Sequence, residues 1–335
     1  MKKIKKIASI LSLTAGLLFS SCEHKELCYD HRHFVDVEVV FDWKNAPDAD
    51  PTTMDIYFVP EEGGASERFQ FAGKNGGRIS VPLGRYNVVG INSDSETNQL
   101  QGTGRWETFE VRTVTTSLLS FLGVRGSEPP RAEGTENERT AYTPDRLWST
   151  GETGMHLTDP TRSYKITLYP ERQLCNYTVK VLNVTNLKYA RDISGALSSM
   201  AGGLLAGSGE LTKELVTMSF PGNSDMVSTI TSNFHVFGHC PTLDNPHKLT
   251  IYAVLADGSR FYKTFDVTDQ VHGATDKCNV EIVIDGLELP KPIINGGGFN
   301  PDVDEWTDGD EIEICLLYTS PSPRDGATSR MPSSA

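Results

Sequence analysis

The sequence has little positive charge for its size. Its 335 residues include 31 Lys and Arg against 44 Asp and Glu, which gives a formal net charge of −13 at pH 7. A protein that binds nucleic acid needs a basic face for the phosphates, so this balance argues against a nucleic-acid partner. Hydrophobic residues make up 38% of the chain and charged residues 22%. These fractions are typical of a globular protein, not of a disordered or polytopic membrane protein.

Motifs for catalysis and for cofactor binding are also lacking. The sequence has no CxxC pair for a zinc ribbon or redox centre, no HExxH, and no GxSxG or SxxK nucleophile motif. Its glycine clusters, such as 296–298, do not follow a strand and open a helix as a phosphate-binding loop does. We therefore predict no enzymatic activity, no cofactor and no metal, although two glycosidase carboxylates could lie far apart in a sequence.

The N-terminus has the features of a bacterial lipoprotein signal. Four lysines within residues 2–6 precede an apolar stretch, residues 7–19, that is too short to span a bilayer. Two serines and then Cys22 follow, and the thiol of a cysteine in this position receives the lipid. We predict that the signal peptide, residues 1–21, is removed and that Cys22 begins a lipidated tether, residues 22–29. A plain signal peptide or a short membrane anchor is the alternative.

The C-terminus contains a segment that does not belong to the natural protein, in our interpretation. Residues 315–325 read CLLYTSPSPRD, which resembles the translation of a transposon-based sequencing adapter. We therefore exclude residues 315–335 from the fold as an assembly artefact. A genuine tail rich in Ser and Pro is the alternative.

Between these ends, short segments of alternating apolar and polar residues indicate β-strands. In the first of them, the apolar residues Val35, Val37, Val39 and Phe41 lie two apart, which is typical of a strand with one buried face. The predicted strands are 35–43, 54–60, 67–73, 78–84, 85–92, 106–113, 163–170, 174–184, 214–220, 227–238, 248–257, 260–268 and 279–285. Their number, and the turn residues between them, predict an all-β protein made of antiparallel sandwiches.

Two segments break this pattern. Residues 123–162 lack apolar periodicity, and we predict a long loop or linker there, in which residues 144–148 dock onto a domain. Residues 190–207 have helix-like apolar spacing but contain four glycines, so we predict a loop with a short helical turn. The predicted domains are thus an N-terminal sandwich, 30–122, and a C-terminal sandwich with a final loop, 163–314.

Four cysteines besides Cys22 remain in the mature chain: Cys28, Cys175, Cys240 and Cys278. In an exported protein they could form two disulfides, with three possible connectivities. Isolated thiols are an equal alternative, because three of them lie in or beside predicted strands, where a free cysteine packs as a small apolar side chain.

Other residue types that could form a site have simpler interpretations. The tether histidines could bind a metal, but they lie at the start of the chain without matching ligands. The remaining candidates are a histidine pair on a predicted strand, an acidic run that could bind Ca²⁺, and tryptophans that could stack on sugars. We interpret all of them as solvated or packing residues: His24, His31, His33, His235, His239, Asp94, Glu96, Asp302, Asp304, Asp308, Asp310, Glu311, Trp43, Trp106, Trp148 and Trp306.

Several motifs resemble those of a known group of surface lipoproteins. These are CEHKELCYDH after the signal, VVFDW, PLGRYNVVGINSD, PDRLW, FDVTDQV and GGGFNPDVDEW. Together they look like Bacteroidota lipoproteins that are similar to the anchor and minor subunits of fimbriae, and the resemblance covers nearly all of residues 22–314. It implies two tandem transthyretin-like β-sandwiches, an N-terminal lipid such as palmitate, and fimbrial subunits as partners.

We therefore predict a non-enzymatic lipoprotein of the cell outer membrane that is exposed at the surface. Its role would be cell adhesion, or that of an anchor or accessory subunit of a fimbria-like assembly. A sandwich with an open edge could contact its partner by adding a β-strand. The first alternative is a carbohydrate-binding lipoprotein, which needs exposed coplanar aromatic rings. The second is a surface hydrolase, which needs a pocket with two carboxylates.

Overall fold

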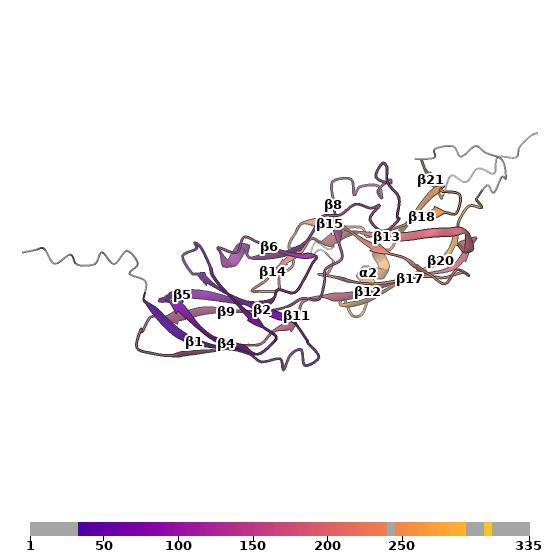
Figure 1. Ribbon diagram of the computed structural model, residues 1–335. Coiled ribbons are helices and arrows are strands. Elements are labelled where there is room, and N and C mark those ends of the chain that lie inside the picture. Colours follow the sequence, from indigo (N-terminus) through magenta and orange to yellow (C-terminus); the bar gives the residue numbers. More distant parts are fainter. Residues whose placement is uncertain (1–32, 240–244, 293–304, 310–335) are drawn as a thin grey trace, which may run out of the picture.

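The computed structural model describes residues 33–239, 245–292 and 305–309. Figure 1 shows an elongated molecule, with most strands from the first half of the sequence at one end and most strands from the second half at the other. The predicted all-β class is confirmed, and the described ranges contain one α-helix, α2 (Thr268–Gly273). Within these ranges, no helix has the length and apolar character that a membrane span requires. The transthyretin-like detail stays a prediction.

Two sheets form the N-terminal lobe. The first has three strands, in the order β10 (Tyr164–Leu168), β1 (Phe34–Phe41) and β4 (Gly76–Pro82). The second has five strands, in the order β11 (Glu171–Arg172), β9 (Trp148–Leu157), β5 (Gly84–Asn92), β2 (Thr53–Pro60) and β3 (Glu67–Ala72). The alternating apolar residues of β1 are buried between the two sheets together with side chains such as Ile56, Phe58 and Leu168. This is the half-buried strand that its period of two predicts.

Two further sheets form the C-terminal lobe. One has the order β16 (Asn223–Ser224), β17 (Ile230–Val236), β12 (Cys175–Thr185) and β20 (Asn279–Glu288). The other has the order β21 (Trp306–Asp308), β19 (Arg260–Asp266), β18 (Lys248–Leu255), β13 (Ala190–Ala201), β15 (Leu215–Pro221) and β8 (Arg139–Tyr142). Their facing sides enclose a core that contains Tyr177 and a stacked pair, Phe220 and Phe234, whose ring centroids are 3.9 Å apart.

A small sheet joins the two lobes. Its order is β14 (Gly203–Leu205), β7 (Glu110–Thr113) and β6 (Asn98–Gln101), so a strand from the second half of the chain pairs with strands from the first. The turn of 3₁₀ helix η1 (Trp106–Thr108) precedes β7, and a second such turn, η2 (Leu187–Tyr189), follows β12. Val59, Ile91 and Phe109 pack into the same apolar cluster as the core of the C-terminal lobe. The lobes therefore share buried surface and are not independent domains joined by a linker.

The predicted docking of residues 144–148 is confirmed. The carboxylate of Asp145 accepts hydrogen bonds from the main-chain N–H groups of Glu96 and Thr97, each at 2.9 Å. The side chain of Asn92 bonds to the backbone on both sides of Leu147, which is 1% exposed. These contacts hold the segment against the N-terminal lobe.

For the rest of residues 123–162, the prediction of a long loop or linker is wrong, because this segment contains β8 and most of β9. The sequence of β9, WSTGETGMHL, has no apolar period, since the strand is held by backbone pairing with β5 and packs through small residues. At Gly151 the carbonyl of Gly207 and the ring of Trp106 leave no room for a Cβ atom. Close packing of this kind leaves no periodic signal in a sequence.

The predicted loop and helical turn at 190–207 are also wrong. The segment forms β13 and β14, and β13 lies in the centre of the six-stranded sheet between β18 and β15. From Ile193 onward every residue of β13 is buried, because both faces of the strand are covered. A strand covered on both faces loses the alternation that marks a half-buried one, and its apolar run resembles that of a helix.

The start of the predicted C-terminal sandwich at residue 163 differs from the observed pairing. Residues 164–168 form β10, which pairs in parallel with β1, and Ile166 and Leu168 are buried in the core of the N-terminal lobe. Two further differences are local. Residues 106–108 are the 3₁₀ turn η1 and not strand, and α2 follows β19 in a segment where no helix was predicted.

Candidate functional site

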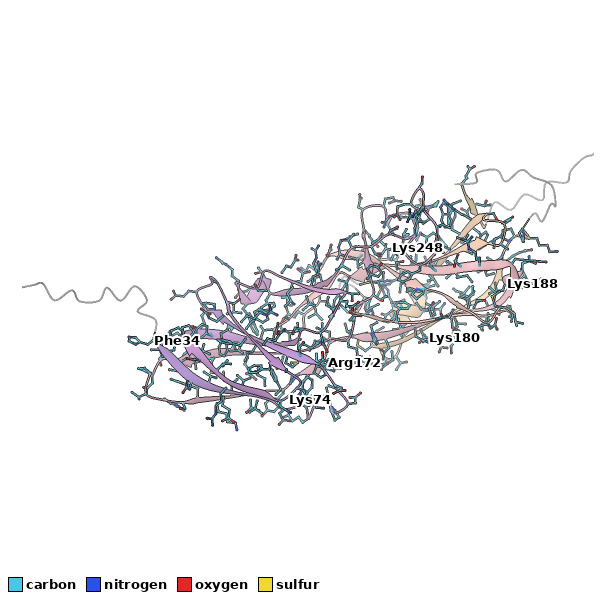
Figure 2. The ribbon with its side chains drawn as sticks, in the orientation of Figure 1. Phe34, Lys74, Arg172, Lys180, Lys188 and Lys248 are labelled. Carbon is cyan, nitrogen blue, oxygen red and sulfur yellow. A yellow bond between two sulfur atoms is a disulfide. The ribbon has the colours of Figure 1, made fainter. Side chains whose placement is uncertain are left out.

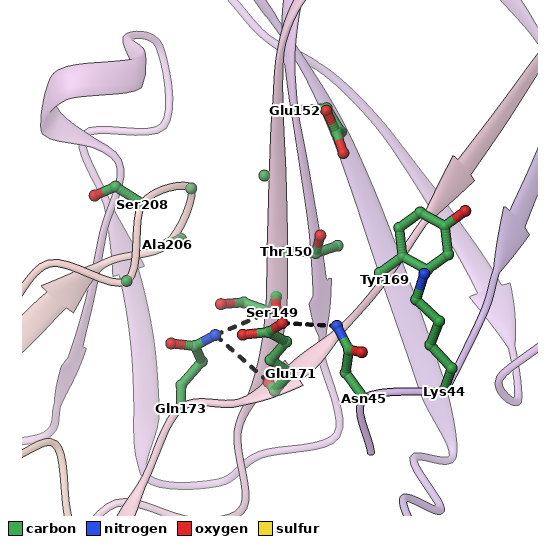
Figure 3. Close-up of a pocket in the computed structure, with 13 residues that line it drawn as sticks. Lys44, Asn45, Ser149, Thr150, Glu152, Tyr169, Glu171, Gln173, Ala206 and Ser208 are labelled. Atoms are coloured by element: carbon green, nitrogen blue, oxygen red, sulfur yellow. Dashed lines mark hydrogen bonds between the residues drawn. The ribbon is translucent and has the colours of Figure 1, made fainter. Parts of the chain in front are cut away.

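A polar cavity of about 340 Å³ lies where the N-terminal lobe meets the loop after β14. Figure 3 shows the lining side chains, which come from the segment after β1, from β9, from β11 and the residues beside it, and from that loop. The lining residues are Lys44, Asn45, Ser149, Thr150, Gly151, Glu152, Tyr169, Glu171, Gln173, Ala206, Gly207, Ser208 and Gly209.

Some polar groups of this cavity bond to one another. Asn45 Nδ2 donates to the carboxylate of Glu171 at 2.7 Å, and Gln173 Nε2 donates to the carbonyl of Ser149 at 3.3 Å. The ammonium of Lys44 lies 3.7 Å from the centroid of the Tyr169 ring, so one face of this ring is covered. The cavity could accept a small hydroxylated molecule, but Tyr169 is the one aromatic residue in its lining, and Lys44 already occupies a face of that ring.

The four tryptophans pack within the protein. Trp43 and Trp148 form an edge-to-face pair with centroids 6.3 Å apart, and Trp306 lies edge-on to Tyr252 at 5.5 Å. Trp106 packs against the backbone of Gly207. The described residues therefore show no row of exposed tryptophan rings of the kind that a carbohydrate-binding face needs.

The edge of the sheet at β20 has a different character. With ten residues, β20 is the longest edge strand within the described ranges, and it pairs on one side, in parallel, with β12. On the other side Gln270 of α2 makes two hydrogen bonds to the backbone of Val283. Its Nε2 donates to the Val283 carbonyl at 3.0 Å, and its Oε1 accepts from the Val283 N–H at 2.7 Å. These are the two bonds that a neighbouring strand would make, so one side chain occupies the place of a strand.

A loop with two exposed apolar residues lies at the end of the C-terminal lobe. Met226 is 51% exposed and Val227 is 75% exposed. The carboxylate of Asp225 accepts N–H groups from Val227, Ser228 and Thr229 at 2.8–2.9 Å, which fixes the loop. These bonds, that of Thr229 first, lower the pKa of Asp225 below its usual value.

The position of this loop follows from its contacts. Val184 N, at the end of β12, donates to the carbonyl of Ser228 at 2.9 Å. Lys188 follows a few residues later and lies at the end of the molecule far from Phe34, as Figure 2 shows. The loop is thus remote from the start of β1, where the N-terminal segment enters.

Two of the predicted cysteine positions form a disulfide. Cys175 begins β12 and Cys278 directly precedes β20, and their sulfur atoms are bonded. Asn176 N also donates to the carbonyl of Cys278 at 2.8 Å, so the bridge lies at the start of the parallel β12–β20 pair. Cys22, Cys28 and Cys240 lie outside the described residues, and the lipidation of Cys22 stays a prediction.

The predicted histidines do not act as one group. His33 is exposed at the start of β1, and His24 and His31 lie outside the described residues. His235 contacts the Arg172 guanidinium at 3.1 Å, and burial, together with that positive charge, lowers its pKa. His239 instead packs with His247 and His272, whose distant sequence positions gave no signal.

The predicted acidic residues have structural roles where they are described. Asp94 accepts the N–H of Thr52 at 2.7 Å, and Asp308 accepts the hydroxyl of Tyr262 at 3.0 Å. Glu96 is part of the loop that Asp145 holds. The rest of the acidic run lies outside the described residues: Asp302, Asp304, Asp310 and Glu311.

Comparison with known proteins gives matches over most of the chain. The profile of a family described as "Domain of unknown function (DUF5119)" matches residues 21–221. A protein of Bacteroides ovatus named "Putative fimbrium anchoring subunit Fim4B" is 20% identical over 339 residues, which cover 91% of this chain and 97% of that protein. The predicted resemblance to lipoproteins similar to fimbrial anchors is thus confirmed.

Solved structures support the fold. The crystal structure of a "putative adhesin" from Bacteroides ovatus aligns with a TM-score of 0.58 at 20% identity, over 82% of this chain and 99% of that one. The fimbrial anchor protein Mfa2 of Porphyromonas gingivalis aligns with a TM-score of 0.45 at 12% identity, over 75% and 90% of the two chains. The second similarity is too low to carry an argument.

Proposed function

We propose that this chain, which belongs to the family described as "Domain of unknown function (DUF5119)", is an outer-membrane lipoprotein that anchors or accompanies a fimbria-like surface assembly. The observation that carries this proposal is the alignment of almost the whole chain with a relative named as a fimbrium anchoring subunit. The role is structural or adhesive, and it involves contacts and no reaction.

Attachment to the membrane is through a lipid on Cys22. Only residues 23–33 separate this cysteine from β1, and Phe34, the first residue of β1, lies at one end of the elongated molecule (Figure 2). Several acyl chains hold a protein stably at a bilayer, because each buried CH₂ contributes about 0.8 kcal/mol. A molecule attached in this way presents its far end, with the loop at Met226 and Val227, to partners beyond the membrane surface.

Contact with the partner is through strand addition at β20. An incoming strand would take over the two backbone bonds that Gln270 makes to Val283 and would extend them to neighbouring residues. Backbone hydrogen bonds provide affinity in this mode, and pockets for alternate side chains provide specificity. The exposed side chain of Val283, the one large apolar residue exposed on β20, would lie against the added strand.

The anchor is tested by labelling cells with a palmitate analogue. We expect label on the wild-type protein and on the Cys28→Ala variant, and none on Cys22→Ala. Filaments should remain on cells of the first two strains and be shed into the medium by the third. Label on Cys22→Ala would refute lipidation at Cys22, and filaments retained by that strain would refute the anchoring role.

The mode of contact is tested separately with a photo-reactive residue placed at Val283. The matched control is the same residue at Glu62, an exposed position in the turn after β2. We expect a cross-link to a filament subunit from Val283 and none from Glu62. If filaments are attached normally and neither position cross-links, strand addition at β20 is wrong while the anchoring role stands.

A further inference from the structure

Three histidine side chains from separate segments come together in the C-terminal lobe. His239 follows β17, His247 directly precedes β18, and His272 is on α2. Their ring centroids are 6.0 Å apart for His239 and His247, 5.7 Å for His239 and His272, and 5.0 Å for His247 and His272. Each ring therefore contacts both of the others.

A β-bulge in β13 holds the ring of His247 in place. The pairing of β13 with β15 shifts between Leu197 and Met200, and the bulge turns the carbonyl of Ser198 toward His247. The Nδ1 of His247 lies 3.0 Å from this carbonyl and donates to it, so Nε2 carries the free lone pair. His247 is 1% exposed, and its backbone N–H and carbonyl are bonded to Thr268 and Val267. A ring fixed through one nitrogen, with the lone pair on the other, has the arrangement of a metal-binding histidine.

The second observation is an unpaired nitrogen. The Nε2 atom of His272 is buried and has no hydrogen-bond partner within the described residues. A buried polar atom without a partner destabilises the fold, so a native protein normally pairs it with an internal group, water or an ion. The neighbours of His272 here are two further imidazoles, which are themselves ligands for metals.

We propose that His239, His247 and His272 bind one divalent transition-metal ion of the zinc class. Imidazole is the ligand that these ions share. With metal–nitrogen distances of about 2.0–2.1 Å, three imidazoles around a tetrahedral ion have centroids about 5 Å apart. The observed centroid distances, 5.0–6.0 Å, are close to this value.

Two features oppose metal binding: the present orientation of the rings, which must change, and a nearby positive charge. As the side chains stand, no three His, Cys, Asp or Glu residues in ranges 33–239, 245–292 and 305–309 have donor atoms placed to hold a metal ion. Since Ser198 fixes the ring of His247, the rings of His239 and His272 must turn toward it. Lys277 is the nearby positive charge and bonds to the carbonyl of His272, whereas Asp266 is a negative charge near His247. The two charges partly offset each other at the site.

The test is a titration with Co²⁺ and then Zn²⁺ of the full mature chain, purified without a polyhistidine tag. We expect one Co²⁺ per chain, with the intense visible absorption of a four-coordinate ion, and its displacement by Zn²⁺. His272→Gln should weaken binding by at least about tenfold, because even the loss of a group that only orients a ligand costs about 10–100-fold in metal affinity. The matched control, His235→Gln, removes a histidine outside the cluster and should bind as the wild type does.

Two further measurements keep the outcome clear. The variant His24→Gln/His31→Gln/His33→Gln, which lacks the tether histidines, should bind Co²⁺ as the wild type does. If this variant binds no Co²⁺, the metal site belongs to the tether and the proposal is overturned. X-ray absorption of the Zn²⁺-loaded wild type should show three imidazole ligands, and fewer than three overturns it even if His272→Gln fails to fold. The absence of any bound Co²⁺ does the same.

Discussion

The disulfide between Cys175 and Cys278 allows the sharpest prediction on stability. The bridge joins residues 103 apart in the sequence, at the start of the parallel β12–β20 pair. Cys278 is exposed, whereas Cys175 is 7% exposed. The Cys278→Ser variant therefore removes the cross-link without a buried cavity, and Cys175→Ser adds the cost of a buried hydroxyl.

The expected size of the effect follows from the closed loop. In the chain-entropy account, a cross-link over about 100 residues stabilises the folded state by about 4.7 kcal/mol, and measured values are typically about 2–4 kcal/mol. We expect Cys278→Ser to lower the free energy of unfolding by about 2–4 kcal/mol, and Cys175→Ser to lower it further. β20 should lose protection first, because its parallel pairing depends on the fixed start of the strand.

Urea denaturation of the oxidised wild type, the reduced wild type and Cys278→Ser measures this difference. The reduced wild type and the variant should coincide, and hydrogen exchange should show early opening at Val280 and Ile282. If reduction changes the free energy of unfolding by less than about 1 kcal/mol, the bridge does not constrain the chain as argued. If Cys278→Ser is far less stable than the reduced wild type, the substitution acts through something other than the cross-link.

Three other substitutions test separate parts of the structure. Phe220→Ala removes a fully buried ring stacked on Phe234 and should lower the free energy of unfolding by about 3–5 kcal/mol in a urea titration, and a loss under 1 kcal/mol would contradict the described core. Gln270→Ala should speed hydrogen exchange at the N–H of Val283 with a stability change of only about 1 kcal/mol, whereas unchanged exchange there would mean that the glutamine does not protect the edge. Burial alone would raise the pKa of Asp145, but the hydrogen bonds that its carboxylate accepts outweigh burial and bring the pKa below its usual value. The ionised carboxylate therefore stabilises the fold at neutral pH, and this contribution is lost as the pH falls through the lowered pKa. Asp145→Asn should therefore cost about 1 kcal/mol at pH 7 after solvent screening, with a difference from the wild type that shrinks below pH 4 in thermal melts, and a difference independent of pH would count against this account.

The strands that the sequence predicts are those with one covered face. In β1 the alternation of Val35, Val37 and Val39 with polar residues follows directly from burial on one side. The turn Asp257-Gly258-Ser259 between β18 and β19 is equally local, since Asp257 accepts bonds from Ser259 and Gly258 has a positive φ of 87°. Information of this kind lies within a few residues, so a sequence reveals it.

The remaining elements depend on neighbours that are distant in the sequence. β13 is buried on both faces, and β9 is held by backbone pairing and close contacts at glycine, so neither has the period of an isolated strand. The same limit applies to the candidate sites. Spacing leaves three connectivities open for four cysteines, and Gln270 meets β20, and His239 meets His272, only through the packing of separate segments.

The parallel pairs bear on how the chain can reach its native state. β1 pairs with β10, and β12 pairs with β20, so each lobe needs a strand that comes more than 100 residues after its partner. Such long-range pairing makes folding slow, because the entropy of closing a large loop is lost before the stabilising contacts form. A polypeptide threaded through a membrane pore with its N-terminus first could not complete the second lobe until residue 288 had emerged. The N-terminal lobe, whose two sheets end at Arg172, could close much earlier, so the two lobes would complete folding at different stages of the crossing.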